Sequence, residues 1–206
     1  LLERAGSFEK GSITALVIAD TVLGDLSGFI QTNLMSITDG HIFFDTEIFN
    51  RGRRPAVNPY LSVTRVGEQA QGVLVKDIGR GISRFLVQYQ KLRDLAHFGA
   101  DFEQRVKDDL SLGNRIFSFF DQQGKYLMPI NVSALVVALI WVGFWKRTRE
   151  VIMKYQVESI LKKYNENQKF KSKIDILIST NTKFDLFTKA VSQDPDFVQF
   201  NKSDDK

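Results

Sequence analysis

The sequence predicts an α/β region followed by an all-α region, with the boundary near Gln71. Two observations carry this prediction. Short runs of β-branched and apolar residues, separated by turn-forming residues, occupy the chain before Gln71. From Gly72 onward, apolar residues instead recur at the three- and four-residue spacing of amphipathic helices. We therefore expect two domains, residues 1–71 and residues 72–206.

Three predicted strands come first in the chain order. Ile13 to Ile18 is rich in β-branched residues and reads as a buried strand. Leu34 to Thr38 and His41 to Phe44 are two further apolar runs, and Asp39-Gly40 between them is a typical hairpin turn. Together these segments predict a buried strand and a β-hairpin.

The connecting segments are expected to be less regular. Asp20 to Asn33 reads as a loop with a short helix, and Glu47 to Gly52 reads as a loop. Arg54 precedes Pro55 and is expected to be extended, because residues before proline avoid the α region. Leu61 to Thr64 then reads as a strand that presents Arg65 at its end.

The second region begins with a long amphipathic helix. Its apolar positions are Leu74, Ile78, Ile82, Phe85, Leu86, Tyr89, Leu92 and Leu95. Phe102 to Leu112 and Ile116 to Phe120 continue the helical spacing, and Gly113 is a plausible break between them. Met128-Pro129 is expected to open another helix, since proline is tolerated in a first turn.

The most hydrophobic run extends from Ile130 to Trp145. A membrane span needs about 20 apolar residues, whereas this run is shorter, contains Asn131 and ends at Lys146. We expect a helix buried in a bundle, with a membrane-inserting segment as the alternative.

The last part of the chain is read from composition. Lys162 to Lys173 is lysine-rich and fits a solvated helix face or a linker. Phe184, Phe187 and Val191 indicate one more helix, which Asp194-Pro195 should end. The polar tail from residue 202 to residue 206 is expected to be disordered.

Composition limits the chemistry of the chain. Its 206 residues are 43% hydrophobic and include 17 Phe, which is enough for a substantial core. The formal net charge of +4 permits anionic partners without requiring nucleic acid. The lack of cysteine excludes disulfides, cysteine nucleophiles and thiolate metal sites. His41 and His97 lack metal-ligand spacing, so no metal site is predicted.

Four motifs occur in a fixed order. Residues 1–5 read L-L-E-R-A, residues 33–40 read N-L-M-S-I-T-D-G, residues 49–58 read F-N-R-G-R-R-P-A-V-N, and residues 62–67 read S-V-T-R-V-G. In this order they resemble the alpha subunit of rotary F-type ATP synthases. The resemblance implies the C-terminal part of a RecA-like nucleotide-binding domain followed by a helical bundle domain. In that family L-L-E-R-A lies downstream of the phosphate loop, and no G-x-x-x-x-G-K-[ST] occurs here, so ATP hydrolysis by the chain alone is not expected.

The resemblance implies that Arg65 has a catalytic role in trans. In the family the arginine of S-V-[ST]-R-V-G reaches the catalytic site of the neighbouring beta subunit, and a guanidinium is planar, permanently charged and suited to phosphate oxygens. Ser36 matches a serine near the same interface and is expected to support it. The alternatives are a surface or salt-bridge arginine at Arg65 and a serine satisfied within its own strand at Ser36.

The resemblance also implies a non-catalytic nucleotide site for ATP or ADP with Mg, whose metal ligands lie outside this sequence. Phe49, Arg54 and Pro55 match family residues that border the adenine, and Gln123 matches a glutamine of a helical-domain loop that approaches it. An aromatic ring and a guanidinium stem form a flat apolar slot suited to a purine. Arg53 replaces the isoleucine of the family, and a basic surface patch is the alternative reading of these arginines.

The implied partners are catalytic beta-type subunits in an alternating hexamer and a central stalk subunit. No nucleic-acid partner is expected, and the complex would sit peripherally on the cytoplasmic face of a bacterial-type membrane. One alternative is a specialised alpha-type subunit of a related ATPase that drives motility or another motor. Another is a basic helical adaptor that binds membrane or RNA, which would account for Arg51 to Arg54 and Lys162 to Lys173.

Overall fold

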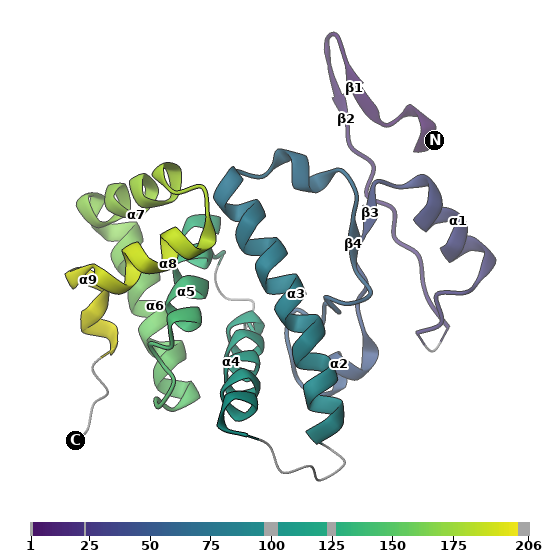
Figure 1. Ribbon diagram of the computed structural model, residues 1–206. Helices are drawn as coiled ribbons and strands as arrows, with labels where there is room; N and C mark the ends of the chain where they lie inside the picture. Colours follow the sequence, from purple (N-terminus) through teal and green to yellow (C-terminus); the bar gives the residue numbers. More distant parts are fainter. Residues whose placement is uncertain (1, 23, 97–102, 123–126, 202–206) are drawn as a thin grey trace. The chain divides into compact units, whose positions relative to one another are not determined.

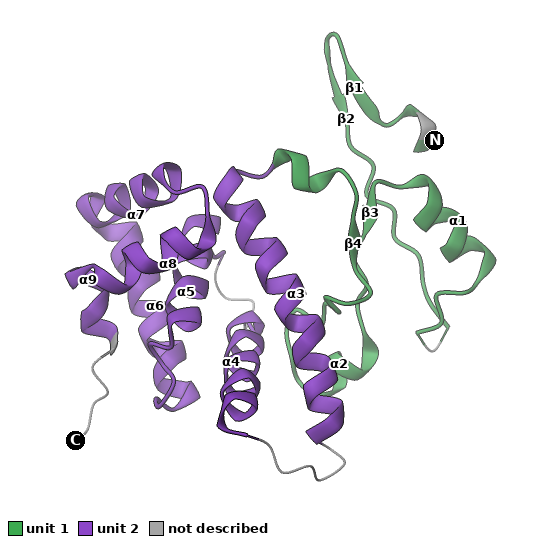
Figure 2. Ribbon diagram, in the orientation of Figure 1, with its two compact units in different colours: residues 1–70 green, residues 71–206 purple. Residues whose placement is uncertain are grey.

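The computed structural model describes residues 2–22, 24–96, 103–122 and 127–201 (Figure 1). Two compact units divide the chain, Leu1–Ala70 and Gln71–Lys206 (Figure 2). The first is a mixture of short strands and helices, and the second is helical in all its regular elements within the described residues.

Unit 1 contains two small antiparallel sheets and two α-helices among its described residues. Its elements are η1 (Leu2–Arg4), β1 (Gly6–Phe8), β2 (Gly11–Ile13), α1 (Phe29–Ile37), β3 (Gly40–His41), α2 (Thr46–Asn50), β4 (Val63–Thr64) and η2 (Gly67–Ala70). β1 pairs with β2, and β3 pairs with β4 across more than 20 residues of sequence. The strand expected at Leu61 to Thr64 is therefore present but shorter.

Several strand predictions in unit 1 are wrong. The segment predicted as a strand at Leu34 to Thr38 forms the second half of α1, where Thr38 ends the helix and donates from Oγ1 to the Leu34 carbonyl at 2.7 Å. The predicted hairpin around Asp39-Gly40 is absent, because β3 pairs with β4 instead of with a preceding strand. Only the first residue of the Ile13–Ile18 run lies in a strand, and Leu16 and Ile18 are 90% and 94% exposed.

The segment from Glu47 to Gly52, expected as a loop, contains α2. Asp45 is the N-cap of this helix, and its Oδ1 accepts hydrogen bonds from the amides of Glu47 and Ile48. A carboxylate at this position satisfies amide donors that have no partner within a helix, and it interacts favourably with the helix dipole. The cap explains how a five-residue helix forms here.

Unit 2 is a bundle of helices around a shared apolar core. Its elements are α3 (Val73–Ala96), α4 (Gln104–Phe120), α5 (Ile130–Val142), α6 (Glu150–Glu166), α7 (Gln168–Thr180), α8 (Phe184–Gln193), α9 (Pro195–Val198) and η3 (Gln199–Asn201). The long helix predicted from Gly72 onward is confirmed as α3, and its buried residues are Leu74, Ile78, Ile82, Phe85, Leu86 and Tyr89.

The apolar run from Ile130 forms α5, as predicted, and lies at the centre of the bundle. It packs against α4, α6, α7 and α8 (Figure 1), and Leu135, Val136 and Ala138 are fully buried. Pro129 is its N-cap, and Gly143 ends it at a φ of +91°, a conformation that glycine adopts without strain. None of the helices among the described residues has the length and apolar character needed to cross a membrane.

The predicted break at Gly113 is wrong, because α4 runs unbroken from Gln104 to Phe120. Gly113 instead permits close packing. A Cβ added there would lie 2.6 Å from Cγ of Tyr89, so the missing side chain makes room for the aromatic ring of α3.

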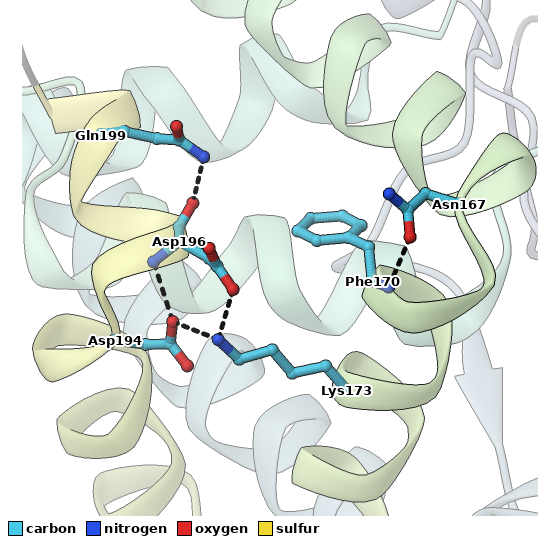
Figure 3. Close-up of polar contacts among 6 residues, drawn as sticks. All are labelled: Asn167, Phe170, Lys173, Asp194, Asp196 and Gln199. Atoms are coloured by element: carbon cyan, nitrogen blue, oxygen red, sulfur yellow. Dashed lines mark hydrogen bonds and ion pairs between the residues drawn. The ribbon is translucent and has the colours of Figure 1, made fainter.

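The end of the described chain is attached to the bundle. The helix predicted at Phe184 to Val191 is confirmed as α8, and Asp194 ends it before Pro195 opens α9. Lys173 of α7 donates to Oδ1 of Asp194 at 2.6 Å and to Oδ2 of Asp196 at 2.5 Å (Figure 3). The lysine-rich segment thus belongs to α6 and α7, and the tail at residues 202–206 lies outside the described residues.

Candidate functional site

Arg65 directly follows β4 and is held by one short segment of unit 1. Its backbone amide donates to the Asp39 carbonyl at 2.8 Å. Its guanidinium donates from Nη2 to the Met35 carbonyl at 2.9 Å and from Nη1 to the Ser36 carbonyl at 3.2 Å. The base and the head of the side chain are therefore both fixed by residues 35–39.

The two carbonyls that accept from the guanidinium lie in the last turn of α1. Carbonyls at a helix C-terminus have no partner within the helix, and the helix dipole places partial negative charge there. This explains why a cation is held at this point. A guanidinium carries five N–H donors, so the two contacts leave donors for a further acceptor, and Arg65 is exposed.

Ser36 contacts Arg65 through its backbone carbonyl, and its support of a subunit interface stays a prediction. The hydroxyl of Ser36 donates to the Asn33 carbonyl at 2.8 Å, inside α1. Such a bond within a helix is common for serine. The acceptors at Met35, Ser36 and Asp39 are backbone atoms, for which residue identity gives no signal.

Phe49 and Arg54 form a stacked pair in unit 1. The guanidinium carbon of Arg54 lies 3.5 Å from the centroid of the Phe49 ring. Nη1 of Arg54 also donates to the Phe49 carbonyl at 2.7 Å, which fixes the guanidinium over the ring. Pro55 follows through a cis peptide bond and is exposed. The pair is a flat surface of the kind that stacks on a purine.

Asp45 and Asn58, which sequence reasoning did not single out, close the segment that carries this pair. Nδ2 of Asn58 donates to Oδ2 of Asp45 at 2.9 Å. This hydrogen bond is the largest cause that holds the pKa of Asp45 below its usual value, and with the amides of Ile48 and Glu47 it outweighs the opposing effect of burial. The capping position of Asp45 before Thr46-Glu47 was the available signal.

Gln123 and the metal ion of the predicted nucleotide site both stay predictions. Gln123 lies outside the described residues, so its approach to Phe49, Arg54 and Pro55 is untested. Within residues 2–22, 24–96, 103–122 and 127–201, no cluster of three or more His, Asp or Glu side chains could hold a metal ion.

Two known domain families match the sequence of this chain. Residues 1–64 match the nucleotide-binding domain of the ATP synthase alpha/beta family. Residues 71–186 match the C-terminal domain of the ATP synthase alpha/beta chain. The chain therefore belongs to the ATP synthase alpha/beta family. Its fold is the end of a nucleotide-binding domain followed by a helical domain, which confirms the predicted fold class and the resemblance.

Among the members of this family, the chain is similar to proteins named ATP synthase subunit alpha. It is 43% identical to that of Ehrlichia canis (strain Jake) over 175 residues, which cover 81% of this chain and 34% of the relative. It is 42% identical to that of Idiomarina loihiensis over 140 residues, which cover 67% of this chain and 27% of the relative. For Glaesserella parasuis the identity is 44% over 131 residues, covering 64% and 25%. The chain thus spans between a quarter and about a third of the length of these relatives.

Proposed function

We propose that the chain is the alpha-type, non-catalytic subunit portion of a rotary F-type ATPase, and that it contributes Arg65 to the catalytic site of an adjacent beta-type subunit. The observation that supports this best is the placement of Arg65. The side chain is anchored at its base and at its head, is exposed, and keeps N–H donors for an incoming acceptor.

Such an arginine accelerates phosphoryl transfer through electrostatics. Negative charge on the phosphoryl oxygens must be stabilised in the transition state, and a cation already in position stabilises it without reorganisation. The carbonyls of Met35 and Ser36 hold the side chain in place before the phosphoryl transfer begins. The entropy cost of immobilising Arg65 is then largely met before the reaction begins.

The proposal includes a second nucleotide, ATP or ADP, that is bound but not turned over. Phe49 and Arg54 fit an adenine because they offer an aromatic ring and a guanidinium in one stack. Pro55 and Gln123 are proposed to complete the border. The nucleotide would bring Mg²⁺, and no ligand for this ion is proposed among the described residues.

The proposed partners are beta-type subunits in an alternating hexamer and a central stalk. Attachment to the membrane would be peripheral, through the rest of the complex at its cytoplasmic face. The relatives named ATP synthase subunit alpha support this assembly.

A specialised motor of the same family is the second candidate. Residues 187–206 lie beyond the family match, yet Phe187, Val191 and Phe197 are fully buried in the bundle. A segment beyond the family match that is packed into the core supports a specialised paralogue. The subunits that copurify with the chain distinguish the two candidates: membrane-sector and stalk proteins support the synthase, whereas unfamiliar structural proteins support the other motor.

Arg65→Lys in the assembled complex tests the proposed role. Turnover should fall by about 10³- to 10⁵-fold, because a point charge on a flexible stem cannot replace a planar, two-pronged donor. Nucleotide binding, measured on the same preparation, should be nearly unchanged, since the contribution appears in the transition state. An intact variant complex with turnover within about tenfold of wild type would reduce Arg65 to a structural residue.

A further inference from the structure

Gly40 lies where the two strands that lead to Arg65 come closest. A Cβ added at Gly40 would lie 2.5 Å from the carbonyl oxygen of Val63 and 3.1 Å from Cα of Thr64. Both atoms belong to the backbone of β4, so no side-chain rotation could relieve the overlap. The approach of β3 to β4 therefore requires glycine at this position.

This close approach determines the position of the Arg65 backbone. Gly40 pairs with Thr64 and His41 pairs with Val63, and these two pairs are the whole β3–β4 ladder. The next hydrogen bond in the same direction joins the Arg65 amide to the Asp39 carbonyl. If the two strands separated at Gly40, this hydrogen bond would lengthen or break.

The head of Arg65 depends on the same approach. Its acceptors, the carbonyls of Met35 and Ser36, precede Gly40 by only a few residues on the same segment. A ladder of two residue pairs has little capacity to absorb a local displacement. A shift at Gly40 thus moves the acceptors and the backbone of Arg65 relative to each other.

We propose that Gly40 is a positioning residue for Arg65: the lack of a side chain at Gly40 lets residues 35–39 hold both ends of the arginine. This inference rests on the proposed role of Arg65 in catalysis. An alanine Cβ needs about 3.4 Å from a neighbour for ordinary contact, which is 0.9 Å more than the 2.5 Å available. Misplacement of a catalytic group by about 1 Å can cost about 10²-fold in rate.

Gly40→Ala in the assembled complex is the test, with Gly67→Ala as the matched control. The control also adds a methyl group beside β4, but its nearest neighbour at 2.7 Å is the Thr64 hydroxyl, which can rotate away. We expect Gly40→Ala to lower kcat by about 10²-fold with nucleotide binding retained, and the control to keep wild-type turnover.

A double variant separates positioning from general damage. If Gly40 acts through Arg65, then adding Gly40→Ala to Arg65→Ala should cause no further loss of kcat. Losses that multiply, or a Gly40→Ala complex as active as the control, would overturn the inference. If Arg65→Ala itself retained turnover, the proposed function would fall, which is a distinct result from an active Gly40→Ala complex beside an impaired Arg65→Ala complex.

Hydrogen exchange of the full chain provides a measurement that does not depend on assembly. The Arg65 amide donates to the Asp39 carbonyl, so we expect Gly40→Ala to speed its exchange while Gly67→Ala does not. Equal protection of this amide in both variants would overturn the inference even if the Gly40→Ala complex could not be assembled.

Discussion

At the scale of single residues, Gly113 and Gly79 are two helical glycines with opposite surroundings. A Cβ at Gly113 would enter the ring of Tyr89, whereas a Cβ at Gly79 would meet no atom within 4 Å. Tyr89 is only 3% exposed, and its hydroxyl donates to Oδ1 of Asn114 at 2.6 Å. The ring is therefore confined by packing and by a hydrogen bond.

We predict that Gly113→Ala destabilises the chain by about 1–3 kcal/mol, because overpacking against Tyr89 outweighs the gain in helix propensity of about 1 kcal/mol. Gly79→Ala is the matched control and should stabilise the chain by about 0.5–1 kcal/mol. Urea denaturation of the full chain measures both variants. A Gly113→Ala protein as stable as the Gly79→Ala protein would mean that the Tyr89 ring relocates without cost.

At the scale of elements, the helices of unit 2 could be predicted because their apolar spacing is a local property. The pattern of α3, the apolar run of α5 and the start of α8 at Phe184 were all readable in the sequence. Strands depend on partners that are distant in sequence, and an apolar run of five residues such as Leu34 to Thr38 cannot be assigned by periodicity alone. This run became helix α1, which is where the strand prediction failed.

In the candidate site, too, some features were readable in the sequence and others were not. The motif S-V-T-R-V-G made Arg65 a candidate in the sequence, and its catalytic role stays a prediction. Its acceptors could not be predicted, because they are carbonyls at Met35, Ser36 and Asp39. Gly40 was expected to form a turn, but its importance is the close approach of two strands, which only the structure defines.

The attachment of α9 to α7 gives a prediction about pH. The hydrogen bond from Lys173 is the main cause that holds the pKa of Asp196 below its usual value (Figure 3). Burial alone would lower the pKa of Lys173, but its hydrogen bonds to Asp194 and Asp196 outweigh burial and raise it. The carboxylate with a lowered pKa contributes stability above its unfolded pKa of about 4, and this contribution is lost as the pH falls through the folded pKa. The lysine contribution is lost only as the pH rises above about 10.5.

We therefore predict that Lys173→Met lowers stability by about 1 kcal/mol near neutral pH, with a deficit that shrinks as the pH falls below about 4. Thermal or urea unfolding of the wild-type and variant proteins, at neutral pH and below about pH 4, measures this difference in stability. Lys169→Met is the control, because Lys169 is exposed on the same helix and forms no ion pair among the described residues. Nζ of Lys173 also lies 5.5 Å from the centroid of the Phe197 ring. A deficit for Lys173→Met that stays constant as the carboxylates protonate would show that the loss of this contact, and not of the ion pairs, is responsible.

At the scale of the whole molecule, the core is distributed very unequally. Among the described residues, every buried apolar side chain except those of Phe43 and Ala56 belongs to unit 2. Unit 1 exposes large apolar side chains, including Phe29 at 83% and Ile18 at 94%. Fixing a residue on folding costs about 1–2 kcal/mol, whereas burying one large apolar side chain returns about 1.5–3 kcal/mol. Two buried side chains cannot offset the ordering of a segment of this length.

We accordingly predict that residues 71–206, expressed alone, unfold in one cooperative transition, whereas residues 1–70 alone show none. Circular dichroism during thermal unfolding measures the transition, and amide hydrogen exchange measures protection in each piece. A cooperative transition of residues 1–70 alone would contradict the prediction. If it holds, the segment that carries Arg65 gains its order from surfaces outside itself, because its apolar side chains need a partner to bury them.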